Sequence, residues 1–309
     1  MATAVSAPSV PLGERRLALA AALTTVVLWA SAFVGIRAAG RALSPGSLAL
    51  ARLVVGTVAL GILLLVRRQP LARRADIPGL LACGILWFGA YNLLLNWAEQ
   101  TVDAGTAAML VNTGPVFIAI LSGLFLHEGF PRRLVVGCVI GFGGAATIGY
   151  ATSTHGFNAG FGAVLCVVAA LVYAGGVTAE KPLLSRNSAL TVTWLACAIG
   201  MVVCLPFAPQ LAHDLTRADA GSIAWAVYLG VFPTAIGFSF WGYALARTSG
   251  GRMGAMGYLV PPVAILLGWV LLGAVPPVLA LLGGVLCLAG VAVTRGTVLN
   301  LGARRRRNT

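Results

Sequence analysis

The stretch AEQTVDAGTAAMLVNTGPVFIAILSGLFLHEGFPRRLVVG, residues 98–137, recurs in pattern 146 positions further along the chain. At this offset Pro115 aligns with Pro261, and Pro131 aligns with Pro277. Small and aliphatic residues coincide often in a chain of this composition, but two proline pairs at matching places in apolar runs do not. Self-similarity at a fixed offset is the mark of a repeated structural unit. The best single hypothesis is an internal duplication.

The composition indicates a membrane protein. Hydrophobic residues make up 59% of the chain and charged residues 9%, with a mean hydropathy of +0.93. A soluble domain carries about 25% charged residues. Apolar runs of roughly 20 residues are long enough to cross a bilayer, and they must be helical so that their backbone groups are satisfied. We find ten such runs: Leu17–Ile36, Gly46–Val66, Ile77–Ala98, Ala104–Leu126, Leu134–Ala151, Gly160–Ala179, Leu190–Ala208, Gly221–Ala246, Gly254–Leu272 and Val278–Thr294.

The predicted fold class is therefore an all-α membrane protein with ten transmembrane helices. The first run could instead be a cleaved signal peptide, but it lacks a clear small-residue cleavage site and nine further spans follow it. We therefore interpret it as a helix of the mature protein.

The basic residues orient the predicted helices. Short cytoplasmic loops are rich in Lys and Arg. With both termini in the cytoplasm, 17 of the 21 basic residues fall on that side, three (Arg37, Arg41 and Arg217) fall outside, and Arg52 lies within a span. The basic tail Arg304–Arg307 could suggest nucleic acid, but anionic lipid headgroups explain it more simply. We expect a multi-pass protein of the cell membrane, with the lipid bilayer and not nucleic acid as its partner.

Two repeats of five helices each must cross the membrane in opposite directions, because five is an odd number. The charges agree, since the acidic loop with Glu99 and Asp103 aligns with a loop that carries Arg247 and Arg252. This is the pattern of inverted-topology repeats in secondary transporters. The predicted organisation is a tail at residues 1–14, one repeat at 15–151, a second at 160–295, and a basic tail at 296–309.

Polar and aromatic side chains within the spans are the candidates for a binding site. Asn92, Asn96 and Glu99 share one face of the third predicted helix. They either hydrogen-bond neighbouring helices or line a water-filled path. Arg52 is a functional candidate: it either anchors a substrate carboxylate or extends to the headgroups. The full predicted cavity wall is Trp29, Arg52, Asn92, Asn96, Asn112, Tyr173, Trp241, Tyr243 and Tyr258.

Two prolines are predicted to weaken helices at the cavity. Asn112 lies one turn before Pro115, and Tyr258 occupies the equivalent place before Pro261. A proline removes a backbone donor and frees a carbonyl. We expect the two prolines to lie at a similar depth on oppositely directed helices and to act as hinges.

The sequence offers no sign of enzymatic chemistry, a cofactor or a metal site. It contains no phosphate-binding loop, no His-Glu-x-x-His and no Cys-x-x-Cys motif. The three histidines are scattered, and the six cysteines lie in apolar spans, where they act as small hydrophobes. The glutamates Glu99, Glu128 and Glu180 lie near predicted helix ends. With no carboxylate in the middle of a span, a proton relay or bound sodium ion is not indicated.

Several motifs carry a resemblance to the drug/metabolite transporter superfamily, of the EamA type with two five-helix units. The resemblance covers about residues 17–294. Its motifs are Trp29-Ala30-Ser31-Ala32-Phe33, Thr106-Ala-Ala-x-Leu-x-x-x-x-Pro115, Leu126-His127-Glu128 and Gly283-x-x-x-x-x-x-Gly290. One departure is Ala274, where the family often has a second glutamate.

The resemblance implies export of small metabolites, often amino acids or related compounds, through a central cavity between the repeats. Together with the inverted repeat, it favours a secondary transporter that works by alternating access. The alternatives are import of a small metabolite and a membrane protein that does not transport, either an intramembrane enzyme or a regulatory subunit. An enzyme would need His, Asp or Glu clustered at membrane depth, and the sequence shows no such cluster.

Overall fold

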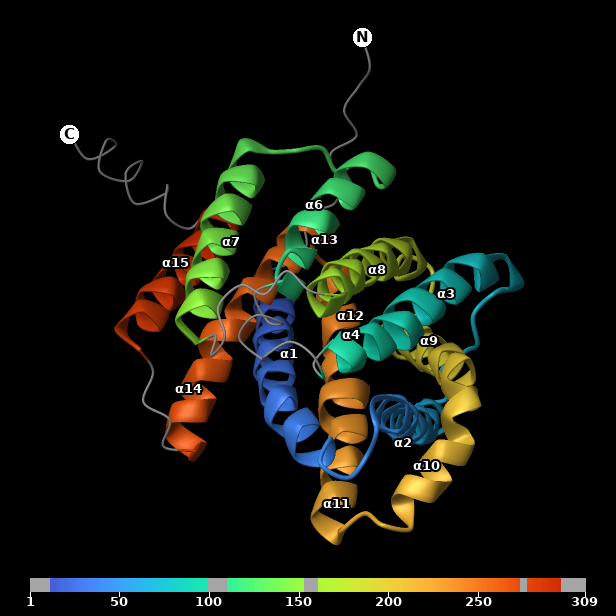
Figure 1. Ribbon diagram of the computed structural model, residues 1–309. Coiled ribbons are helices and arrows are strands. Elements are labelled where there is room, and N and C mark those ends of the chain that lie inside the picture. The colour runs from blue at the N-terminus through green and yellow to red at the C-terminus, as the bar shows by residue number, and fades with distance from the viewer. Residues whose placement is uncertain (1–11, 99, 101–109, 153–160, 273–276, 296–309) are drawn as a thin grey trace, which may run out of the picture.

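The computed structural model describes residues 12–98, 100, 110–152, 161–272 and 277–295. Within these ranges every regular element is a helix and there is no strand. Six of the helical segments are long and apolar enough to cross a membrane (Figure 1): Gly13–Ala32, Pro45–Val66, Arg74–Ala98, Phe161–Leu183, Ala189–Leu215 and Ala220–Ala246.

Several of these segments change helix type along their length. The elements are α1 (Leu12–Ala39), α2 (Pro45–Val66), η1 (Arg74–Asp76), α3 (Ile77–Cys83), η2 (Gly84–Ala90), α4 (Tyr91–Ala98), α6 (Gly114–Phe125), α7 (Arg132–Thr152), α8 (Phe161–Leu183), α9 (Ala189–Cys204), η3 (Leu205–Phe207), α10 (Ala208–Leu215), α11 (Ala220–Leu229), η4 (Gly230–Gly237), α12 (Phe238–Ala246), α13 (Gly250–Ala255), η5 (Met256–Leu259), α14 (Val260–Leu272) and α15 (Val278–Arg295).

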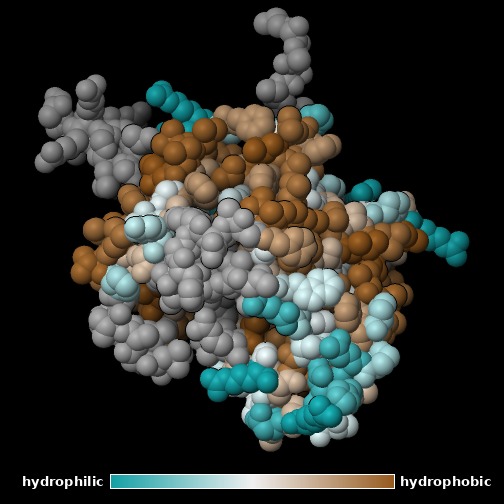
Figure 2. Space-filling view, in the orientation of Figure 1, coloured by the Kyte–Doolittle hydropathy of each residue, from teal (hydrophilic) through white to brown (hydrophobic). Residues whose placement is uncertain are grey.

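Large apolar side chains face outward along most of these helices. Leu65 of α2 and Val139 of α7 expose 78% and 67% of their surface. Figure 2 shows hydrophobic residues over much of the described face, with hydrophilic residues gathered around α10 and α11 at its lower edge. Soluble monomers rarely expose apolar patches of more than a few hundred Å². This surface suits a hydrocarbon surrounding, as expected for a multi-pass membrane protein.

Helices α7 and α15 pack side by side through glycines that occupy equivalent places in the two repeats (Figure 1). A Cβ added to Gly137 would lie 2.6 Å from the Gly290 carbonyl oxygen, and one on Gly290 would lie 2.7 Å from that of Gly137. Gly144 and Gly283 approach one another in the same reciprocal way, at 2.6 and 2.7 Å. Gly137 and Gly283 are 146 residues apart, and so are Gly144 and Gly290, so the repeat relates the first contact to the second. Helices α7 and α15 are therefore antiparallel and nearly two-fold symmetric.

A second set of contacts obeys the same symmetry. The third segment of each repeat contains a π-helical stretch, η2 in one and η4 in the other, which begin at Gly84 and Gly230. A Cβ on Gly84 would meet Ile199 Cβ at 2.6 Å, and a Cβ on Gly230 would meet Val55 Cβ at 2.5 Å. Each π segment therefore packs on the second helix of the other repeat, which joins the repeats through equivalent surfaces.

The helices break directly before the two aligned prolines. Asn112 and Thr113 form a turn before α6, and the 3-10 segment η5 precedes α14. Pro115 and Pro261 then lie in the first turn of α6 and α14, where a missing amide costs nothing. Both prolines are buried, so neither faces lipid. The regular α-helix is thus interrupted before both prolines, by a turn in one repeat and by a 3-10 segment in the other.

Other predicted boundaries shift by several residues. α1 begins five residues before the predicted Leu17, and α8 continues past Ala179 to Leu183. The extension of α8 places Glu180 inside a helix and not at a loop. Residues 104–109 of the fourth predicted span lie outside the described residues, as do residues 1–11, Glu99, Asp103, Ala274 and the basic tail.

Candidate functional site: a cavity between the repeats

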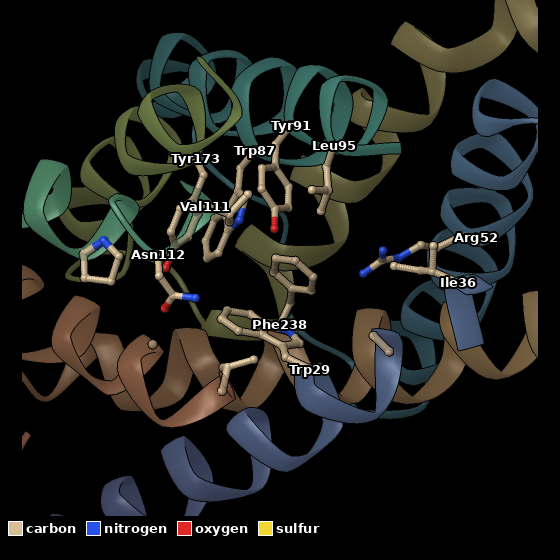
Figure 3. Close-up of a pocket in the computed structure, with 14 residues that line it drawn as sticks. Trp29, Ile36, Arg52, Trp87, Tyr91, Leu95, Val111, Asn112, Tyr173 and Phe238 are labelled. Carbon is tan, nitrogen blue, oxygen red and sulfur yellow. The ribbon is translucent and has the colours of Figure 1, made fainter. Parts of the chain in front are cut away.

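A cavity lies between the two repeats, with side chains from both. It encloses about 780 Å³ of space, counting the part that is open at its mouth. Because its α1, α2 and α4 residues lie near the connection from α1 to α2, the cavity occupies that half of the bundle, which we call the α1–α2 end. The lining residues are Trp29, Ala32, Ile36, Arg52, Trp87, Tyr91, Leu95, Val111, Asn112, Pro115, Tyr173, Phe238, Gly257 and Val260 (Figure 3).

An aromatic cluster forms one wall of the cavity. The Phe238 ring lies 5.2 Å from Trp29 and 4.9 Å from Trp87, and Trp87 lies 5.4 Å from Tyr173 (centroid distances). Such tilted and edge-on pairs are favourable and hold each ring in place. The Trp29 indole also donates to the Pro233 carbonyl at 3.3 Å, one of the carbonyls of η4. The wall is therefore a rigid apolar surface built from both repeats.

Arg52 is the one charged side chain among the lining residues. It is 8% exposed, and its Nε donates to Thr234 Oγ1 at 2.8 Å. Thr234 in turn donates to the Leu229 carbonyl at 2.8 Å, across the π-helical turn of η4. In Figure 3, Arg52 and Asn112 lie at opposite ends of the labelled group, with Trp87, Tyr91 and Phe238 between them. The cavity thus combines a positive group at one place with an aromatic wall beside it.

Polar contacts tie the helices together at the other end of the bundle, where α12 connects to α13. Lys181 Nζ of α8 donates to the carbonyl of Leu245, near the end of α12, and to the carbonyl of Thr248, in the connection to α13. Glu128 accepts the Gly250 amide at 2.9 Å, which joins the α6–α7 connection to the start of α13. We call this the α12–α13 end.

An ion pair adds to these contacts. Glu14 of α1 and Arg247 lie 3.1 Å apart, with 49% and 30% of their side chains exposed. A pair this accessible contributes little by itself. The Lys181 and Glu128 contacts are the main polar links that close the α12–α13 end.

A comparison with protein families matches the EamA-like transporter family twice, over residues 16–150 and 160–296. The chain belongs to the EamA-like transporter family. The two matches correspond to the two repeats, and the family is one of transporters within the drug/metabolite transporter superfamily, as the sequence motifs suggest.

This EamA-like chain is similar to several named proteins. It is 42% identical over 294 residues to a protein of Streptantibioticus cattleyicolor named "Probable terminal-alkyne amino-acid exporter", covering 94% of this chain and 96% of that protein. It is 32% identical over 267 residues to an uncharacterised transporter of Bacillus subtilis, covering 86% and 87%. It is 26% identical over 282 residues to a "Probable amino-acid metabolite efflux pump" of Salmonella typhimurium, covering 88% and 92%.

A solved crystal structure shares the fold of this EamA-like transporter. The TM-score is 0.74 at 20% identity, and the match covers 93% of this chain and 98% of the other. At that identity the likeness concerns the fold alone.

Four of the nine residues predicted for the site of this EamA-like transporter line the cavity. They are Trp29, Arg52, Asn112 and Tyr173, and the predicted hinge residue Pro115 lines it too. Arg52 is buried and lies among the cavity residues.

The two asparagines of the third segment lie elsewhere. Asn92 is 2% exposed, and its amide donates to the carbonyls of Phe88 at 2.7 Å and Trp87 at 3.5 Å. Asn96 donates to the Pro45 carbonyl at the start of α2, at 3.0 Å. Both amides thus satisfy backbone carbonyls, one in the π-helical stretch and one in a neighbouring helix.

The other predicted aromatic residues surround the cavity without lining it. Trp241 is buried behind Trp29, with ring centroids 4.8 Å apart. The Tyr243 ring lies beneath the Arg247 guanidinium, 3.8 Å from its centroid. Tyr258 is fully buried against Gly141 of α7, and its hydroxyl has no hydrogen-bond partner among the described residues.

Sequence reasoning did not select Trp87, Tyr91 and Phe238 as lining residues. The predicted face of the third helix assumed 3.6 residues per turn. The lining residues Trp87, Tyr91 and Leu95 keep that spacing, at i, i+4 and i+8, and so share one face. Asn92 and Asn96, which were selected for their polarity, lie one residue further along, on the neighbouring face. The only signal for these lining residues in the sequence was the clustering of aromatic residues in the third segment of each repeat.

The described residues contain no group of three or more His, Cys, Asp or Glu side chains that could hold a metal. All six cysteines are buried, and none forms a disulfide. The arrangement can bind a small molecule between an arginine and aromatic rings, and it offers the helix breaks that a moving transporter needs.

Proposed function

We propose that this protein is a secondary transporter that exports amino acids or closely related small metabolites by alternating access. The observation that carries the proposal is the cavity between two symmetric repeats, with Arg52 facing an aromatic wall. The names of the relatives in Streptantibioticus and Salmonella support the substrate class. The family supports transport in general.

The proposed topology has ten transmembrane helices with both termini in the cytoplasm of the cell. In this proposal the six long apolar segments, the shorter apolar helices Gly114–Phe125 and Val278–Thr294, and the helices α7 and α14 are the ten crossings. The distribution of Lys and Arg supports the orientation. With it, the α12–α13 end faces the cytoplasm, and the cavity lies in the outer half.

The proposed substrate binds with its carboxylate at Arg52 and its side chain on Trp29, Trp87 and Phe238. A guanidinium matches a carboxylate through paired hydrogen bonds. The aromatic wall receives an apolar side chain, and π faces favour a nearby ammonium group. Asn112 and Tyr173 supply the remaining polar contacts. Asn92, Asn96, Trp241, Tyr243 and Tyr258 support the site from behind.

Alternating access follows from the symmetry. The two repeats share one fold but adopt different conformations. If each repeat takes the conformation of the other, the cavity closes on one side of the membrane and opens on the other. Here the ties at the α12–α13 end hold that end closed. We place the moving points at the helix breaks before Pro115 and Pro261, where a change of dihedral angles disturbs few hydrogen bonds.

The test uses purified full-length protein in liposomes loaded with a panel of radiolabelled amino acids, including propargylglycine, which carries a terminal alkyne. Exchange of at least one amino acid, lost in the Arg52→Gln variant, supports the proposal. No exchange of any amino acid by well-inserted protein overturns it and favours a regulatory membrane protein. Accumulation inside right-side-out cells would favour the alternative of an importer.

A further inference from the structure

Glu180 is a buried carboxyl group that the proposed transport site does not use. It lies in α8, two turns beyond the cavity residue Tyr173, and only 3% of it is exposed. Its Oε2 has no hydrogen-bond partner among the described residues. Carboxylates are almost never fully buried unless they are paired. The residue therefore needs a physical explanation beyond packing.

A second buried polar atom without a partner lies near this carboxyl group. Thr193 Oγ1 of α9 also has no hydrogen bond within the described part of the chain. Glu180 Oε1 and Thr193 Oγ1 lie 3.2 and 3.7 Å from the place that a Cβ on Gly242 would occupy. Gly242 thus leaves a small space in which a glutamic acid, a hydroxyl and a proton can be accommodated.

Among the described residues, Lys181 is the charged neighbour that acts directly on Glu180. Lys181 gives two hydrogen bonds to the Leu245 and Thr248 carbonyls, and the described residues show no ion pair between it and Glu180. Adjacent helical residues point about 100° apart, which keeps the two groups on different faces. The ammonium group is therefore committed to the end of α12.

The remaining titratable groups do not compensate a negative charge. The elements packed against α8 carry four titratable or charged side chains: Cys83 of α3, Tyr91 of α4, Tyr243 of α12 and the exposed Arg252 of α13. The elements η2 and α6 carry none. On α8 itself there are Cys166 and Tyr173, and Glu128 lies near Lys181. Cys83 and Tyr173 are within electrostatic range of Glu180, and both are neutral at physiological pH. Burying an ionised carboxylate in such a place costs several kcal/mol. The carboxyl group is therefore protonated in this conformation.

We propose that Glu180 is a proton-binding site that couples substrate export to proton entry. This inference rests on the proposed transport function. While the α12–α13 end is closed, Glu180 holds its proton away from water. When that end opens, Lys181 leaves the α12 carbonyls, water reaches Glu180, and the O–H bond breaks to give a carboxylate and a proton in the cytoplasm.

The proton is replaced from the outer side. Tyr173 lines the cavity and lies about 10 Å from Glu180 along the same face of α8. The cavity is thus the nearest outward space from which Glu180 can be recharged. One proton then moves inward for each substrate that moves outward.

The experiment compares two activities of full-length protein in liposomes, with propargylglycine as the probe. In the Glu180→Gln variant we expect exchange without a pH gradient to stay within about twofold of wild type. Accumulation driven by a pH gradient should fall at least tenfold, and the proton flux that accompanies substrate should disappear. Gradient-driven accumulation and proton flux at wild-type levels in this variant would overturn the proposal.

Two further measurements separate coupling from other causes. Asp219→Asn, at an exposed helix cap, should keep full coupling, because asparagine also caps helices.

If Glu180→Gln fails to insert, the wild-type protein is treated at pH 7 with dicyclohexylcarbodiimide, which reacts with protonated carboxyl groups in apolar surroundings. Modification of Glu180 found by mass spectrometry supports the proposal, and an unmodified Glu180 overturns it. If the wild-type protein exchanges no amino acid at all, the result contradicts the proposed transport function and not the proposed proton coupling.

Discussion

The Cys287 thiol lies 3.6 Å from the carbonyl oxygen of Gly141, and these two residues occupy the same position of the two repeats. A residue can contact its own symmetry equivalent only close to the symmetry axis. The pseudo-two-fold axis therefore passes between α7 and α15 at this point. Because two equivalent helices related by such an axis run in opposite directions, this contact is direct structural support for an inverted repeat.

Substitution of Gly144 should disrupt the pairing of α7 with α15. A Cβ there would lie 2.6 Å from both the Cys287 amide nitrogen and the Gly283 carbonyl oxygen, and backbone atoms cannot move aside easily. Overpacking of this kind costs about 1–3 kcal/mol. We expect Gly144→Val to lower the melting temperature in detergent and to reduce transport.

Gly143 is the matched control on the same helix. It is exposed, and a Cβ there would meet no atom within 4 Å. Gly143→Val should leave the melting temperature close to wild type. Equal destabilisation by both substitutions would show that helix propensity, and not the glycine contact, determines the loss.

Arg52 should determine the affinity for the substrate carboxylate. Hydrogen bonds to charged groups contribute about 1.5–3 kcal/mol, which corresponds to roughly a 10–150-fold change in binding. We expect Arg52→Gln to raise KM for an amino acid by this factor. Thr234→Val, which removes the 2.8 Å contact to Nε, should cause a smaller rise.

A substrate without a carboxylate tests the role of Arg52. For the corresponding amine, wild type and Arg52→Gln should show similar KM values, since the interaction is already missing. If the variant loses transport of the amine and the amino acid equally, Arg52 acts through structure and not by binding the carboxylate.

Gly257 should limit the size of the substrate. A Cβ at this position would lie 3.3 Å from the Pro115 ring and 4.0 Å from the Tyr173 hydroxyl, inside the cavity. Gly257→Leu should therefore reduce transport of a leucine-sized amino acid about tenfold and that of alanine much less. Competition between the two labelled substrates measures the ratio. An unchanged ratio would place the substrate elsewhere.

Lys181 should stabilise closure of the α12–α13 end. Lys181→Met removes both hydrogen bonds to the Leu245 and Thr248 carbonyls and shifts the population toward the state open at that end. We expect a several-fold faster reaction of Cys83 with a maleimide added on the cytoplasmic side. Cys287, buried between α7 and α15, should react at the wild-type rate. Unchanged labelling of Cys83 would contradict the role of Lys181.

Membership of the transporter family and the repeat could be predicted from the sequence because they depend on local composition and on a fixed offset. The aligned Pro115 and Pro261 mark real breaks for the same reason, since proline has no amide to continue a helix. The cavity was predicted less well. Trp29 and Tyr173 line it, whereas Asn92 and Asn96 bond to backbone carbonyls.

The errors share one physical cause. Asn92 and Asn96 were selected for their polarity, but backbone carbonyls satisfy their amides, and the neighbouring face with Trp87, Tyr91 and Leu95 lines the cavity. A π-helical turn is held by packing on the second helix of the other repeat, through the contacts of Gly84 and Gly230. Those contacts join residues more than 100 positions apart, so no local pattern reveals them.

The sequence by itself determined the class of protein and the duplication, because the hydrophobic effect acts on composition and on run length. Only the tertiary structure decided which polar groups meet. Glu180 lies near the end of α8, as expected, but packing against Gly242 of α12 buries the carboxyl group. Likewise, Arg52 faces the cavity because Thr234 of the other repeat binds its Nε. The burial of a side chain and its hydrogen-bond partners depend on how the helices pack together, and they determine where a charged group is stable.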